Sequence, residues 1–169
     1  MYSGKTSATA LRRALTVGAG LLGSLAGGWL GDRLLKVTGK AYFIVSGVGL
    51  ILALPAGVAA VLSKSYPLTL ALFFAAEALA FLNMGPLNGV IVWVSAPAVR
   101  SMAFAANIFV IHALGDALSP TLIGLASDRW GLPAALVGAM SFLGAAGLFC
   151  LWGAMHVEAE SAEVDRAER

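Results

Sequence analysis

Three titratable side chains lie within long apolar stretches of the sequence. Glu77 is surrounded by alanine and phenylalanine, and His112 and Asp116 are four residues apart in a second such stretch. A charge at bilayer depth costs about 2.5–3.5 kcal/mol on insertion scales, so it needs a partner or a wet cavity. Helical spacing places His112, Asp116 and Ser119 on one face. Two interpretations stay open for this face: a cavity-facing proton or cation site, or a packing network that holds the helix near Pro120.

Three asparagines join Glu77, His112 and Asp116 in the candidate substrate or coupling set. For Glu77 we expect an acid that faces a cavity, and the alternative is a pairing with a residue of a neighbouring helix. Asn83, Asn88 and Asn107 either line a path or bond between helices, and we expect interhelical bonding. His112 and Asp116 are the remaining members of the set.

Other kinds of chemistry have little support in the sequence. Cys150 is the one cysteine, and His112 and His156 lie 44 residues apart, so no spacing of metal ligands is present. A nucleophile beside His112 and Asp116 is not evident. No run of Lys and Arg has interleaved aromatic residues of the kind that binds nucleic acid. The sequence therefore predicts no enzyme, no catalytic, cofactor or metal site, and no nucleic-acid partner.

The segment 17–23, VGAGLLG, matches the G-x-G-x-x-G fingerprint of dinucleotide-binding proteins. That fingerprint needs a strand before it and a helix after it, so that the helix N-terminus holds pyrophosphate. Here the glycines lie inside one apolar run of helical length. Gly23, Gly27 and Gly31 recur every four residues, a spacing that lets a neighbouring backbone approach closely. The pattern favours helix packing over nucleotide binding.

The composition indicates what kind of element must position these residues. Of 169 residues, 59% are apolar and 12% are charged, against about 45–50% and about 25% in soluble domains. Such a chain cannot bury its apolar surface in its own core, which excludes the soluble and disordered classes. A membrane-spanning helix needs about 20 mainly apolar residues. The sequence predicts an all-α integral membrane protein with five spans, at about 14–30, 41–62, 68–94, 102–125 and 133–155.

The flanks divide the chain into three parts. Residues 1–13 form a polar lead, residues 14–156 form the transmembrane domain, and residues 157–169 form an acidic tail that we expect to be frayed or a short solvated helix. Pro86 predicts a bend or tilt in the third span. Lys and Arg are divided almost evenly between the two sides, so the positive-inside rule decides no orientation. This tie suggests that helices are missing from the chain.

The first interhelical loop resembles a known signature. Gly28, Leu30, Asp32 and Arg33 precede a Gly39-Lys40 pair, in the pattern of the loop that joins helices 2 and 3 of the major facilitator superfamily. Five residues separate Arg33 from Gly39, which suits the looser copy of the loop between helices 8 and 9. The resemblance implies a gating role for this loop, and it is carried by Gly28, Asp32, Arg33, Gly39 and Lys40.

A second resemblance is more specific. The segment 81–88, FLNMGPLN, leads through Pro97 and Arg100 to Asn107, His112, Gly115-Asp116 and Ser119-Pro120. This series is similar to the end of helix 10 and all of helix 11 in spinster-like transporters, a branch of the same superfamily. Trp93 departs from the pattern, because a second asparagine is expected near it. In this register the five spans correspond to helices 8–12, most of the C-terminal six-helix bundle.

This resemblance implies a function. Members move small or lipid-like organic solutes by alternating access, in which two helical bundles rock about a central site. The chain would then be the truncated C-terminal portion of a secondary active transporter. Its partners would be the lipid bilayer, the solute, and the missing N-terminal half or another chain that supplies it. A plasma membrane or bacterial inner membrane is the expected location. The alternative is a small five-helix membrane protein that binds partners or oligomerises and transports nothing.

Overall fold

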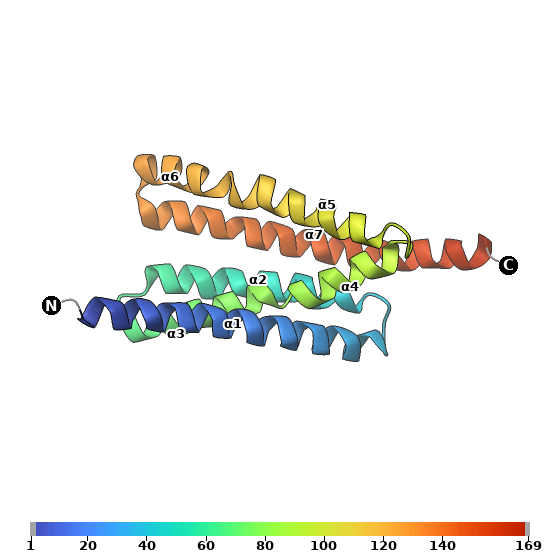
Figure 1. The fold of residues 1–169 in the computed structure, drawn as a ribbon, viewed down its shortest axis with the longest axis horizontal. Coiled ribbons are helices and arrows are strands. Elements are labelled where there is room, and N and C mark those ends of the chain that lie inside the picture. Colours follow the sequence, from blue (N-terminus) through green and yellow to red (C-terminus); the bar gives the residue numbers. More distant parts are fainter. Residues whose placement is uncertain (1–2, 168–169) are drawn as a thin grey trace.

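The computed structural model describes the backbone of residues 3–167 and the side chains of residues 9–156. This part of the chain is helical and contains no strand (Figure 1). The helices, in chain order, are α1 (Ser3–Leu35), α2 (Ala41–Leu62), α3 (Tyr66–Phe81), α4 (Met84–Val94), α5 (Arg100–Val110), the π-helical turn η1 (Ile111–Asp116), α6 (Ser119–Trp130) and α7 (Leu132–Ala167).

Five helical stretches are long and apolar enough to cross a membrane. They are Thr9–Leu35, Ala41–Leu62, Tyr66–Val94, Arg100–Trp130 and Leu132–His156. Helices suit such stretches because they satisfy every backbone N–H and C=O internally where no water is present. The third stretch comprises α3 and α4, and the fourth comprises α5, η1 and α6. The prediction of five membrane-spanning helices is confirmed.

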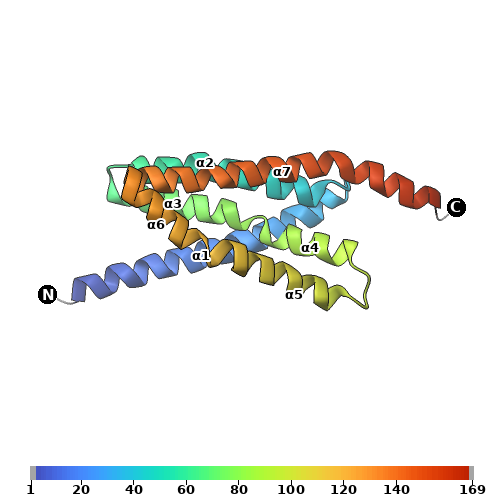
Figure 2. The ribbon, with the colours of Figure 1, turned by 90° about the horizontal axis from the view of Figure 1, so that it is seen from above.

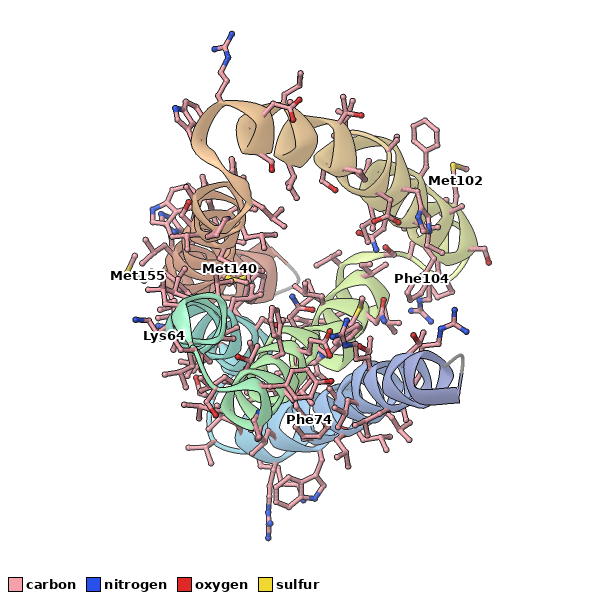
Figure 3. The ribbon with its side chains drawn as sticks, turned by 90° about the vertical axis from the view of Figure 1, so that its left-hand side faces the viewer. Lys64, Phe74, Met102, Phe104, Met140 and Met155 are labelled. Atoms are coloured by element: carbon pink, nitrogen blue, oxygen red, sulfur yellow. The ribbon has the colours of Figure 1, made fainter. Side chains whose placement is uncertain are left out.

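Helices α2 and α7 run antiparallel and lie side by side along one edge of the bundle (Figure 2). Their backbones approach each other at two glycines. A Cβ atom built on Gly47 would lie 2.9 Å from the carbonyl oxygen of Gly147, and one built on Gly147 would lie 2.8 Å from that of Gly47. Farther along, Gly57 faces the side chain of Met140, which lies between α7 and α2 in Figure 3. Small residues thus bring the two helices into close van der Waals contact.

The third span is interrupted just before its proline. Helix α3 ends at Phe81 and α4 begins at Met84. Pro86 has no N–H to donate to the carbonyl of Leu82, and its ring clashes with that carbonyl in a regular helix. The regular α-helical hydrogen bonding therefore stops at Leu82 and Asn83, although both residues keep right-handed helical backbone angles. The Leu82 carbonyl lies against Gly27 of α1.

The fourth span contains a π-helical turn that the apolar pattern does not predict. In η1 the N–H of Ala117 donates to the carbonyl of His112 over 3.0 Å, a bond across five residues. The same backbone rule explains the interruption, because Pro120 cannot donate to the carbonyl of Asp116. π-helical turns are rare and occur frequently at functional sites.

The fourth span lies at the edge of the bundle. Helices α5 and α6 form one side of the end-on view, with the labelled Met102 and Phe104 on α5 (Figure 3). No residue in the most apolar window of this span is buried within the chain. Packing within the described residues is therefore concentrated among α1, α2, α3 and α7.

The first and last helices extend beyond the predicted spans. Helix α1 begins at Ser3, so residues 3–13 of the expected polar lead are helical. Helix α7 continues to Ala167, through most of the expected acidic tail. The side chains of residues 157–169 lie outside the described part of the structure.

Candidate functional site

Glu77 lies in a cavity between α1 and α3. The cavity has a volume of about 360 Å³ and is lined by apolar and aromatic side chains together with Arg12, Thr16 and Tyr66. The hydroxyl of Thr16 donates to Oε1 of Glu77 over 3.2 Å. The Arg12 guanidinium lies 5.9 Å from the centre of the Tyr66 ring, a cation–π contact. One cavity thus offers a carboxylate, a cation and aromatic faces.

The position of Glu77 depends on the close packing of α1 against α3. Gly23 lies against the carbonyl of Ala78, and Gly27 lies against that of Leu82, so a Cβ atom at either glycine would overlap the facing backbone. Because Ala78 follows Glu77 directly, this contact sets the distance between Thr16 and the carboxylate. The small residues of α1 therefore help to form the cavity.

His112 and Asp116 form an interacting pair on η1. Nδ1 of His112 lies 2.6 Å from Oδ2 of Asp116, and the two side chains are 66% and 68% exposed. Both are therefore accessible from outside the described bundle. Ser119 belongs to α6, beyond the interruption, and lines a separate cavity between α6 and α7. The regular helical register that groups Ser119 with the pair is broken by η1, so that grouping stays a prediction.

The three asparagines are spread over two spans. Asn83 lies in the break of the third span, where its carbonyl accepts from the N–H of Leu87 over 2.9 Å. Asn88 is exposed on α4, and Asn107 is half-buried on α5. Their roles as bonds between helices or as path-lining residues stay predictions.

The loop between α1 and α2 is held by a tyrosine that the sequence did not single out. The hydroxyl of Tyr42 donates to Oδ1 of Asp32 over 2.9 Å. Its ring lies between Gly31 of α1 and Gly89 of α4: a Cβ atom built on either glycine would lie 2.8 Å from the nearest ring carbon. Tyr42 therefore connects three helices at the carboxylate of the candidate gating loop. A tyrosine at the start of a span is typical of membrane interfaces, and this was the available signal.

The other residues of the candidate gating loop have separate environments, and Gly28, Asp32 and Arg33 lie within α1, which continues to Leu35. The Arg33 guanidinium lies 4.7 Å from the centre of the Trp29 ring. The α-carbon of Gly28 faces Gly85 of α4, and a Cβ atom on Gly85 would lie 2.8 Å from it. A Cβ atom at Gly39 would meet nothing within 4 Å, and the N–H of Lys40 donates to Oγ1 of Thr38 over 3.3 Å.

No described part of the chain gathers three or more His, Cys, Asp or Glu side chains as metal ligands. The glycines of the 17–23 segment lie in the middle of α1, with no strand before them among the described residues.

The fold defines a class of protein: a multi-pass, all-helical integral membrane protein. Comparison with known proteins narrows this class. "Probable sphingolipid transporter spinster homolog 3" of Arabidopsis thaliana is 30% identical over 136 residues, 79% of this chain and 26% of its own length. "Protein spinster homolog 1" of Xenopus laevis is 35% identical over 140 residues, 80% of this chain and 27% of its own. "Protein spinster" of Drosophila melanogaster is 34% identical over 116 residues, 68% and 19% of the two lengths.

The chain belongs to the spinster family, a branch of the major facilitator superfamily. It spans about a quarter of the length of the curated relatives it matches. No family model matches it.

Proposed function

We propose that the chain is the C-terminal portion, helices 8–12, of a secondary transporter that moves a small or lipid-like organic solute by alternating access. The observation that carries the proposal is the alignment of 68–82% of the chain with relatives of the spinster family. Three of these relatives carry names that specify sphingolipid transport. No catalytic role is part of the proposal, and the membrane is the plasma membrane or a bacterial inner membrane.

The surface of the described helices supports a larger assembly. An open apolar cavity of about 600 Å³ lies between α6 and α7, and small residues form much of its lining. A Cβ atom at Gly115 or Gly138 in this lining would meet nothing within 4 Å. Small residues on a membrane helix are typical of a contact with another helix. We infer that helices from the N-terminal part, or from another chain that supplies it, cover this side of the bundle.

The cavity at Glu77 is the proposed contact with the solute. Its carboxylate suits an ammonium or a proton, Arg12 suits an anionic group, and the aromatic side chains suit a hydrocarbon segment. This combination fits an amphipathic solute with a charged head. His112 and Asp116 are the second proposed site, for a proton or cation, and the asparagines are proposed bonds between helices.

The loop between α1 and α2 is the proposed cytoplasmic gate. Asp32→Asn keeps the shape of the side chain but removes its charge, so in a full-length protein we expect it to change the transport rate more than folding. The measurement is uptake divided by the amount of folded protein. A rate equal to that of the unchanged protein would make Asp32 an ordinary interfacial charge.

The proposal is tested first at the DNA level. An open reading frame that continues upstream and encodes seven further membrane-spanning helices supports the transporter. A stop codon directly before Met1, together with a stable assembly of this chain alone in the membrane, would favour the small five-helix protein instead.

A further inference from the structure

We propose that a groove between α1 and α2 binds one anionic glycerophospholipid of the surrounding bilayer, with its headgroup at Arg33 and an acyl chain along α2. The groove has a volume of about 510 Å³ and lies at the end of α1. This site is separate from the cavity at Glu77, and lipid binding there does not depend on transport activity.

The groove has one polar end and an apolar interior. Arg33 lines it at the end of α1, where its guanidinium lies 4.7 Å from the centre of the Trp29 ring. The loop that follows adds Lys36 and Lys40, so the local charge is positive despite Asp32. Basic pockets between membrane helices bind anionic lipid headgroups. Trp29 has the residue type that marks the interface where such headgroups lie.

The interior of the groove has the length of one leaflet. Its α2 lining extends from Ile44 to Leu52, which is about 12 Å at the helical rise of ~1.5 Å per residue. Half of a hydrocarbon core of about 30 Å is about 15 Å. Val37 at the polar end is 82% exposed and Leu52 at the far end is 50% exposed, so the groove is open to the side along this length.

The side chains that line this groove differ from those of a surface that packs against another helix. Branched aliphatic residues line it, among them Leu30, Leu34, Val45 and Val48. The cavity between α6 and α7 is lined instead by glycine and alanine at several positions. Membrane helices pack closely through small residues. Large branched side chains form an uneven apolar surface that suits a flexible acyl chain.

The test measures lipid binding by the 169-residue chain. The chain is purified into nanodiscs of phosphatidylcholine with a minority of phosphatidylglycerol, and lipids retained after gentle release are counted by native mass spectrometry. We expect one retained phosphatidylglycerol in preference to phosphatidylcholine. Arg33→Gln should lower this retention about fivefold, the change expected for one cation at an anionic surface.

Two further variants keep the result interpretable. Arg129→Gln removes a cation at the end of α6 and should leave retention unchanged. Val48→Trp fills the groove and should lower retention of both lipids, while circular dichroism reports whether the variant still folds. Free glycerol phosphate should not raise the thermal stability of the chain.

Three outcomes of these lipid measurements would overturn the proposal. They are equal retention of the two lipids, equal losses in Arg33→Gln and Arg129→Gln, or protection by glycerol phosphate alone. A crosslink from Val48 to a preceding helix in a full-length protein would also overturn it, because the groove would then hold a helix.

Discussion

Glycines occur in two contrasting environments in this molecule. At two positions of α1 and between α2 and α7 they lie directly against neighbouring backbone: Gly23 against Ala78, Gly27 against Leu82, and Gly47 against Gly147. On the fourth span, a Cβ atom at Gly115 or Gly124 would meet nothing within 4 Å. The difference shows that a small-residue pattern identifies a potential helix contact, whereas the rest of the chain determines whether a partner is present.

The largest expected effect comes from enlarging a glycine in the packed region. Gly27→Leu would place a side chain on the Leu82 carbonyl, and overpacking costs about 1–3 kcal/mol. We expect a value near 3 kcal/mol, because the facing atoms belong to backbone that cannot rotate away. Thermal unfolding in detergent measures the loss of stability.

The matched control is Gly124→Leu on the open fourth span, where we expect little change. Equal stability of Gly27→Leu and the unchanged protein would refute the packing of α1 against the break in the third span. Equal destabilisation by both variants would remove the contrast between the two regions.

A smaller loss of stability is expected when the hydrogen bond between Tyr42 and Asp32 is removed. Tyr42→Phe removes the hydrogen bond to Asp32 but keeps the ring between Gly31 and Gly89. The expected loss is about 1 kcal/mol, typical of one hydrogen bond. Chemical denaturation measures it, with Tyr66→Phe as the control because the ring beneath Arg12 is kept. A loss in the control as large as in Tyr42→Phe would show that the bond to Asp32 contributes nothing specific.

The smallest effect on stability is expected for substitutions in η1, on the open fourth span. His112 and Asp116 interact within one turn of η1, and both side chains are about two-thirds exposed, so their interaction does not hold η1 against another described helix. Asp116→Asn should therefore change the stability of this chain by less than about 0.5 kcal/mol, and Asp116→Leu by little more. A larger loss in Asp116→Leu alone would support a packing network. In a full-length transporter, a folded Asp116→Asn variant whose uptake no longer responds to pH would instead make Asp116 a coupling residue.

Much of the fold follows from the distribution of apolar residues, because each span must hide its backbone from lipid. The five spans are therefore predictable from their length and their scarcity of charge. The interruptions are harder to predict. Pro86 indicates a disturbance in the third span, but the helix ends at Phe81 because the affected carbonyl belongs to Leu82. Pro120 similarly affects Asp116, and the resulting η1 turn depends on local backbone geometry that hydropathy does not contain.

The candidate site is less predictable than the fold. Glu77 is conspicuous because a carboxylate in an apolar run is costly, but its contact with Thr16 joins residues 61 positions apart. Tyr42 was missed for the same reason. Its role depends on contacts with Gly31, Asp32 and Gly89, which come together only in the folded structure. Such contacts between helices depend on how the spans pack, and the periodicity within one span does not specify that packing.

The central claim, that this chain is the C-terminal portion of a spinster transporter, is tested most directly by uptake into proteoliposomes. A fluorescent sphingoid base is offered to vesicles that contain the 169-residue chain alone, or the same chain joined to the seven preceding helices of the transporter that we propose. We predict uptake by the joined protein, no uptake by the chain alone, and at least a tenfold lower rate in joined Glu77→Gln that still folds. Equal rates in the joined protein and in empty vesicles would contradict the account.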